Sequence, residues 1–389
     1  MEKVNNRLNC LDSLRGIAAL IVVLSHLTLM TPESLRDSVH GIAEALHSLP
    51  NAVVYAFLKI SMASRSAVLL FFVLSGFVLA RSLERKTPFF EYLIKRFFRI
   101  YPILFFTIIT SFFLHKEIGF NHEVSSNWLE RICDIDISLK NLLQNLLLWG
   151  TTDANKLNGV IWSLVYELRI SIIFPFILWS VSKFKLKAVI LWMLLSIAST
   201  FYVHFITGGF INGYAVKSFA LTWVNTIYFI IFFAVGAYLS INSKITTTYL
   251  IKIPVWLLVP FSIIVFYGLF KSASGGTFVV VDDYIRGFGA AWLIALAISF
   301  KKIDNALNLK IPLWLGHISY SLYLIHIPII YVIVQTWTSL SLIETAIVVL
   351  IISLGAAQIM ANLIEFPMNS LGKIISKKLI HIRPLWQKN

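Results

Sequence analysis

The stretch LDSLRGIAALIVVLSHLTLM, Leu11 to Met30, is long and apolar enough to cross a bilayer, yet it carries three ionisable side chains. At ~100° per residue, Arg15 and His26 lie on one face of this helix, separated by ~16 Å along its axis. Asp12 can pair with Arg15 three residues further on. Because charge in hydrocarbon is costly, such residues face a bundle interior or a wet cavity and are functional candidates. An interhelical hydrogen bond is the alternative role for His26.

The composition of the whole chain places it among membrane proteins. Its 389 residues are 58% hydrophobic and only 13% charged, and the mean hydropathy is +0.80. These values predict an all-α, polytopic integral membrane protein. The net charge of +14 comes from basic residues in short segments between apolar runs. Positive-inside topology accounts for that pattern, so no nucleic-acid partner is expected.

Apolar runs of spanning length recur after the first, at 67–80, 100–114, 160–181, 188–206, 219–239, 253–270, 285–300, 311–335 and 343–364. The sequence therefore predicts about ten transmembrane helices. Lys and Arg gather on alternate connections, such as 81–99, 183–187 and 301–310, whereas acidic residues gather on the others. Both termini are accordingly predicted to be cytoplasmic.

Two apolar stretches do not fit as spans. Residues 51–62 are too few, and residues 139–149 carry several polar side chains, so both are predicted as outer-side amphipathic or re-entrant pieces. The acidic connection 116–159 is either a cap facing an acceptor or a solvated loop. Cys10 and Cys133 have no metal-ligand or redox spacing, are expected on opposite membrane sides, and are not expected to pair.

Further polar residues lie inside the predicted spans. His26 is expected in the outer half of the bilayer, and Glu167, in IWSLVYELRIS, is expected ~10 Å below the outer boundary. Ser163 shares a helix face with Glu167. His326, in GHISYSLYLIHIP, again falls in the outer half, while the neighbouring tyrosines are interpreted as interhelical hydrogen-bonding residues. The sequence thus predicts a carboxylate and a hydroxyl at the depth of His26.

The cytoplasmic side carries a different signal. Arg96 and Arg99 stand in KRFFRIYP at the start of a span. Guanidinium groups bind phosphate through paired hydrogen bonds, but topological positive charge explains these residues equally simply. The chain lacks Walker-type, GxGxxG, HExxH and GxSxG motifs, which argues against nucleotide hydrolases, zinc proteases and soluble-type esterases.

Taken in order, these motifs resemble membrane-bound acyltransferase family 3, whose bacterial members O-acylate surface and exported glycans. The resemblance rests on Arg15 and His26 in the first span, Arg96 and Arg99, and the segments FFVLSGF (71–77), WSLVYE (162–167), FFAVGAYL (232–239) and GHISYSLYLIHIP (316–328). It covers nearly the whole chain. We assign residues 1–370 to the transmembrane domain of this family and residues 371–389 to a short basic cytoplasmic tail.

The resemblance implies a catalytic site and its substrates. His26 would be the general base, with a transient acyl carrier as its alternative role, Glu167 would orient or charge-stabilise it, and Arg15 would complete the site. Arg15, Arg96 and Arg99 would contact the donor, while Ser163, Tyr166 or His326 would serve as oxyanion or acceptor contacts.

The expected co-substrate is acyl-CoA, foremost acetyl-CoA, with no tightly bound cofactor and no metal. The acceptor would be a glycan or lipid-linked sugar at the outer side of a bacterial cytoplasmic (inner) membrane. A transporter or flippase of a lipid-linked sugar is the competing hypothesis, because buried His, Glu and Arg also line transport paths.

Overall fold

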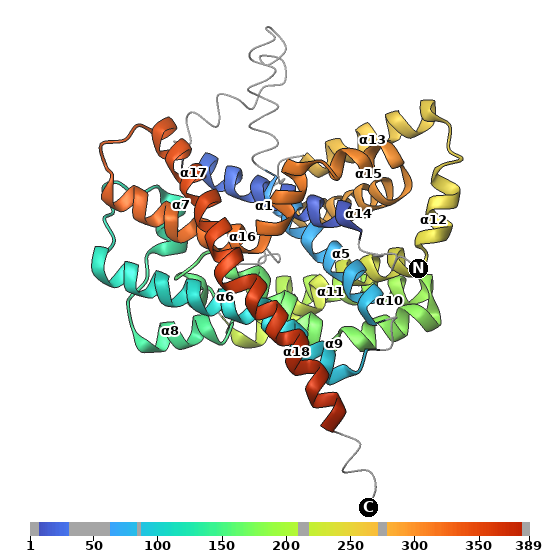
Figure 1. Ribbon diagram of the computed structural model, residues 1–389, viewed down its shortest axis with the longest axis horizontal. Coiled ribbons are helices and arrows are strands. Elements are labelled where there is room, and N and C mark those ends of the chain that lie inside the picture. Colours follow the sequence, from blue (N-terminus) through green and yellow to red (C-terminus); the bar gives the residue numbers. More distant parts are fainter. Residues whose placement is uncertain (1–7, 31–62, 84–86, 209–217, 271–277, 383–389) are drawn as a thin grey trace, which may run out of the picture.

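The computed structural model of the chain describes residues 8–30, 63–83, 87–208, 218–270 and 278–382. Within these ranges the protein is built from helices and connecting loops, without a strand (Figure 1). The helices are α1 (Asn9–Leu29), α5 (Ser64–Leu83), α6 (Phe89–Ile118), α7 (Asn127–Cys133), α8 (Leu139–Leu146), η1 (Asp153–Asn155), α9 (Ile161–Phe184), α10 (Leu186–Thr207), α11 (Phe219–Ile241), α12 (Ser243–Leu250), α13 (Val255–Phe270), α14 (Phe278–Ser299), α15 (Lys301–Leu307), α16 (Lys310–Thr336), α17 (Leu342–Met360), η2 (Ala361–Glu365) and α18 (Phe366–Ile382).

The all-α, polytopic membrane fold is confirmed. Each of the ten apolar runs coincides with a helix. Eight helices in the described part of the chain are long and apolar enough to cross a membrane, or nine if α14 and α15, which meet at a 99° bend, form one span. The remaining apolar run, 253–270, forms α13, which is a shorter apolar helix. Large apolar side chains such as Phe205 (86% exposed) cover the outer surface, as expected where lipid replaces water.

The first span packs against α16 through two glycines. A Cβ atom on Gly16 would lie 2.3 Å from the backbone nitrogen of Gly316, and one on Gly316 would lie 2.5 Å from the Asp12 carbonyl oxygen. Small residues of this kind let helix backbones approach closely. Ten residues further along each helix, His26 meets His326. The two helices therefore run in parallel with a constant register, as the first and ninth of ten alternating spans would.

A second glycine contact joins α5 to α11. A Cβ on Gly76 would lie 2.1 Å from the Phe233 carbonyl oxygen, and one on Gly236 would lie 2.0 Å from that of Val73. These glycines belong to the segments FFVLSGF and FFAVGAYL. Both segments thus mark a close helix crossing in the core of the bundle.

The connection between α6 and α9 contains α7 and α8. Helix α8 exposes Leu139, Leu143 and Leu147 at four-residue spacing while burying Asn145. This arrangement is opposite to that of a helix on a water-soluble core and agrees with an amphipathic piece at 139–149, whose outer-side placement stays a prediction. The other such piece, 51–62, lies outside the described residues.

At the C-terminal end, α17 continues through the π-helical turn η2 into α18, the red helix that leads toward the C-terminus in Figure 1. A Cβ on Gly372 would lie 2.5 Å from Cβ of Phe98 in α6. Residues 371–382, assigned from sequence to a basic tail, thus continue α18 along α6.

Candidate active site

The imidazole of His26 lies against two partners from distant parts of the chain. Its Nδ1 atom is 2.8 Å from Nε2 of His326 in α16, and the two rings lie edge to edge, with centroids 5.1 Å apart and planes 12° from parallel. The Trp128 ring of α7 stacks on the same imidazole with a centroid separation of 5.0 Å. His326 is fully buried, whereas His26 keeps part of its surface accessible. The pair therefore presents one accessible imidazole supported by a buried one.

Helix α7 begins at a side-chain cap. The Ser126 hydroxyl accepts a hydrogen bond from the Leu129 backbone N–H, which satisfies a free donor at the start of the helix. Trp128 follows directly and covers His26. The connection 116–159 therefore contributes to the site, and this geometry favours the cap interpretation over that of a plain loop.

Helix α16 holds the surrounding helices together through polar side chains. Tyr320 donates to the carbonyl oxygen of Ile100 in α6 at 2.7 Å. Ser321 donates to Glu365 of η2 at 2.8 Å. Tyr323 lies 2.7 Å from Ser163 of α9 and donates to the preceding Val160 carbonyl at 3.1 Å. The interpretation of these tyrosines as interhelical hydrogen-bonding residues is confirmed.

Glu167 of α9 belongs to a cluster of ion pairs and hydrogen bonds with residues of α5 and α6. Its carboxylate accepts from Arg96 Nη2 at 2.5 Å and from the Ser75 hydroxyl at 2.9 Å. Arg96 also donates from Nε to Ser171 at 2.9 Å. Arg96 is nearly buried, with 9% of its side chain exposed, while Glu167 keeps 21% exposed. Arg96 is therefore a nearly buried partner of Glu167 and not a free charge at the surface.

Arg15 lies near the same cluster. It pairs with Asp12 at 3.1 Å, as the spacing predicted, and keeps 17% of its side chain exposed. Its guanidinium also lies within electrostatic range of Arg96, Arg99 and Glu167. Among the described residues, Arg99 has no hydrogen-bonding or ion-pair partner, and it lies within electrostatic range of Glu365. The cluster thus presents two partly accessible guanidinium groups, those of Arg15 and Arg99.

The structure differs from the predicted pairing of Glu167 with His26. Glu167 pairs with Arg96, and His26 pairs with His326. The reason lies in the register of α9, because Ser163 contacts Tyr323, three residues before His326. Glu167 is one turn further along α9, which places it toward Arg15 and away from His26.

The three predicted oxyanion or acceptor contacts fall in different surroundings. Ser163 bonds to Tyr323, and His326 bonds to His26. Tyr166 is buried on α9 and accepts from Asn225 of α11 at 3.3 Å. His326 is thus one of the two imidazoles, Ser163 contacts α16 three residues before it, and Tyr166 belongs to the contact with α11.

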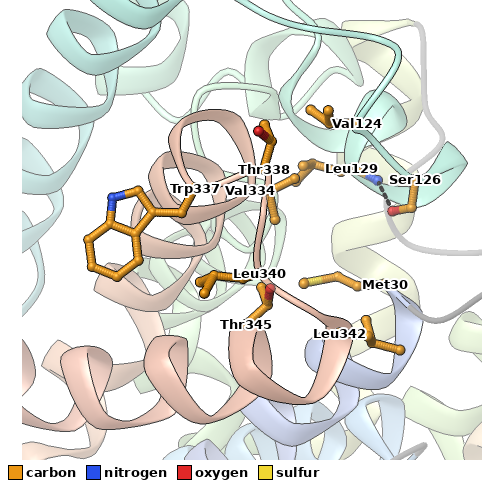
Figure 2. A pocket seen from close by; sticks show the side chains of 10 residues that line it. All are labelled: Met30, Val124, Ser126, Leu129, Val334, Trp337, Thr338, Leu340, Leu342 and Thr345. Atoms are coloured by element: carbon orange, nitrogen blue, oxygen red, sulfur yellow. Dashed lines mark hydrogen bonds between the residues drawn. The ribbon is translucent and has the colours of Figure 1, made fainter.

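A cavity of about 290 Å³ lies at the end of α1, between the segment that carries α7 and the connection from α16 to α17 (Figure 2). Met30, one turn beyond His26 on the same face of α1, lines it together with Leu129, the neighbour of Trp128. Its lining residues, shown in Figure 2, are Met30, Val124, Ser126, Leu129, Val334, Trp337, Thr338, Leu340, Leu342 and Thr345. The lining combines apolar and hydroxyl side chains, and His26 and His326 do not belong to it.

Sequence reasoning missed a second buried ionic network. Asp283 of α14 is fully buried and pairs with Arg65 at 2.5 Å and with Arg286 at 3.3 Å. Tyr228 donates to the same carboxylate at 2.9 Å. Asp283 belongs to the acidic residues that were predicted to lie on the outer connections, but it lies inside α14. The i,i+3 spacing of Asp283 and Arg286 within an apolar stretch was the available signal.

The cysteines do not serve as nucleophiles in this arrangement. Cys10 and Cys133 are buried and free. Burial raises the pKa of the Cys133 thiol at the end of α7, so it stays protonated at neutral pH. A buried neutral thiol is a poor acyl acceptor.

Comparison with known proteins agrees with the site. The model of a family described as an acyltransferase domain matches residues 8–361. The chain belongs to this acyltransferase family. An O-acetyl transferase of Shigella phage Sf6 is 28% identical over 177 residues, which are 42% of this chain and 44% of the phage protein. The chain thus matches less than half of the length of that relative, and no solved structure matches it.

Family membership favours one of the two functional hypotheses. The chain belongs to an acyltransferase family and has helices long and apolar enough to cross a membrane, which agrees with the acyltransferase hypothesis. The matched range includes the imidazole pair, the ion-pair cluster and the connection that carries Trp128.

Proposed function

We propose that this acyltransferase moves an acyl group, foremost acetyl, from acyl-CoA in the cytoplasm to a hydroxyl of an exported or surface glycan, or of its lipid-linked precursor. The observation that carries the proposal is the accessible imidazole of His26, which is supported by a buried histidine and lies one helical turn before Met30, a residue that lines a cavity. The O-acetyl transferase activity in the phage relative's name supports the choice of acyl group and acceptor atom. We place the protein in a bacterial cytoplasmic membrane with acceptor chemistry at its outer face.

The donor side of the proposal rests on Arg15 and Arg99. Both guanidinium groups are partly accessible, and Arg99 has no hydrogen-bonding or ion-pair partner among the described residues. A guanidinium fork binds phosphate oxygens through two hydrogen bonds. Arg96 supports them by fixing Glu167. The acyl end of the donor would then cover the ~16 Å between Arg15 and His26.

The acceptor side rests on the cavity beyond His26. Ser126, Thr338 and Thr345 contribute hydroxyl groups to a largely apolar lining. Small-molecule sites commonly combine an apolar wall with a few polar groups that fix orientation. A sugar hydroxyl presented from this cavity would approach the imidazole of His26, one turn before Met30 along α1.

The chemistry follows from these positions. His26 takes the proton of the acceptor hydroxyl while the oxygen attacks the thioester carbonyl. Ser163 is a hydroxyl donor near the imidazole pair for the oxyanion that forms. When the tetrahedral intermediate collapses, the carbon–sulfur bond breaks, and the CoA sulfur leaves with the proton that His26 held. The products are an ester and free CoA.

The test compares glycans from cells that produce the wild-type protein, the His26→Ala variant or no protein. Mass spectrometry of surface and secreted glycans should show an acyl-group mass increment only with the wild-type protein. The membrane content of both variants is measured by immunoblotting. Acylation by His26→Ala at the wild-type level, or no acylation with abundant wild-type protein, would contradict the proposal.

A further inference from the structure

The orientation of His326 follows from its two hydrogen bonds. Its Nδ1 atom lies 3.0 Å from the carbonyl oxygen of Leu322, one turn earlier in α16. A carbonyl oxygen only accepts, so Nδ1 of His326 must carry a proton. In a neutral imidazole the other nitrogen, Nε2, is then an acceptor.

The acceptor on His326 determines the tautomer of His26. Since Nε2 of His326 has no proton to give, the 2.8 Å contact requires Nδ1 of His26 to be the donor. The second nitrogen of His26, Nε2, is left with a free lone pair. A chain of two hydrogen bonds thus runs from the Leu322 carbonyl through both rings and ends at this nitrogen.

We propose that His326 is a positioning residue that fixes His26 as the Nδ1–H tautomer, so that Nε2 of His26 is the base that takes the acceptor's proton. This inference deepens the proposed function and rests on it. The arrangement assigns to a neutral, fully buried imidazole the orienting task that a carboxylate performs in a Ser-His-Asp triad. It also explains how His26 is oriented although Glu167 pairs with Arg96.

The same bond stabilises the charged form of the base. When His26 holds the substrate proton, its Nδ1–H donates a charge-assisted hydrogen bond to Nε2 of His326. Stacking against Trp128, together with the in-plane hydrogen bond to His326, keeps the ring in this plane. His326 itself neither gains nor loses a proton in the reaction.

Two substitutions of His326 separate positioning from packing. His326→Gln places a carboxamide close to the position of Nε2 and retains an acceptor, whereas His326→Phe keeps a planar ring and removes the acceptor. Purified protein in nanodiscs is assayed for acyl transfer from acetyl-CoA to glycans extracted from cells that lack the protein. We expect His326→Phe to lower kcat on the order of 10²-fold with little change in KM for acetyl-CoA, and His326→Gln to stay within ~10-fold of wild type.

His115→Phe is the matched control. His115 is also buried in a spanning helix, bonds through Nδ1 to the carbonyl oxygen four residues earlier (Ser111, 2.7 Å), and stacks on Tyr331 with centroids 3.8 Å apart. It makes the same local contacts away from His26. The control variant should keep the wild-type kcat.

A spectroscopic measurement makes the tautomer directly visible. ¹⁵N spectra of histidine-labelled protein should show His26 protonated at Nδ1 in the wild type and in His326→Gln, and a loss of that preference in His326→Phe. A wild-type kcat and unchanged His26 tautomer in His326→Phe would overturn the positioning role and leave the proposed function intact. Wild-type transfer by His26→Ala would instead overturn the proposed function, and this inference with it.

Discussion

At the scale of single residues, the side chain of Glu167 separates two accounts of the site. Its carboxylate bonds to Arg96 and Ser75, so it neutralises a nearly buried guanidinium. Removing one partner of a buried ion pair leaves the other uncompensated. The role of Glu167 is therefore expected to be structural support of the donor end, at a distance from the imidazole pair.

We expect Glu167→Ala to destabilise the protein by about 3 kcal/mol, because Arg96 loses its carboxylate. Glu167→Gln should lose less, since the amide oxygen can still accept from Ser75. Thermal unfolding in detergent measures both. Ser75→Ala, which removes one hydrogen bond to the same carboxylate and leaves the ion pair, is the control and should cost about 1 kcal/mol. Equal unfolding temperatures for Glu167→Ala and wild type would refute this role.

Arg99 and Arg96 should differ in their effects on the donor. Arg99→Ala removes an unpaired guanidinium, so binding of CoA should weaken about 10-fold while the unfolding temperature stays close to that of wild type. Arg99→Lys should restore binding only in part, because it keeps the charge and loses the fork. Isothermal titration with CoA provides the measurement.

Arg96→Ala should instead lower the unfolding temperature, because Glu167 is left unpaired. Arg81→Ala, at the end of α5, controls for the general loss of a positive charge. Unchanged CoA affinity in Arg99→Ala would leave this arginine as a topological charge only.

At the scale of elements, the site depends on the contact between α1 and α16. Gly16 and Gly316 allow the backbones to touch, and the parallel register then places His26 opposite His326. A side chain at the glycine contact would wedge the helices apart below the imidazole pair. The two glycines therefore help to set the distance between the imidazoles.

Gly316→Ala should destabilise the protein by about 1 to 3 kcal/mol and reduce acyl transfer, because its Cβ would lie 2.5 Å from the Asp12 carbonyl oxygen. Gly355→Ala in α17 is a matched control, since no heavy atom lies within 4 Å of its added Cβ. That variant should be neutral or slightly stabilising, because Ala has the higher helix propensity. Thermal unfolding and transfer assays should show this contrast; equal effects of the two substitutions would exclude a special role for the glycine contact.

At the scale of the whole molecule, the orientation in the membrane stays a prediction from charge. Reporter fusions after Glu123 should indicate a location outside the membrane, and fusions after Lys185 should indicate a cytoplasmic location, because basic connections remain in the cytoplasm. The parallel direction of α1 and α16 agrees with ten alternating crossings. A reversed reporter pattern would exchange the proposed donor and acceptor sides.

The sequence predicted the helical fold well because apolar runs of spanning length need no tertiary information. It also predicted the Asp12–Arg15 pair, since this depends on spacing within one helix. The interhelical bonds of Tyr320 and Tyr323 were predictable in kind, because polar side chains inside a span bond to neighbouring helices. The partners of Glu167 and His26 depend on the relative register of α1, α6, α9 and α16, which no single segment encodes. Trp128 was missed because its position results from a capped helix in a long connection.

The central claim is that His26 acts as the base in transfer across the bilayer. The most direct measurement uses oriented vesicles with acetyl-CoA confined to the side of the α9–α10 connection and a membrane-impermeant glycan on the opposite side. The wild-type protein should acylate the glycan, whereas His26→Ala should lose transfer by ~10² to 10⁴-fold while it still binds CoA. Wild-type-level transfer by His26→Ala, or transfer only when both substrates share one side, would contradict the account.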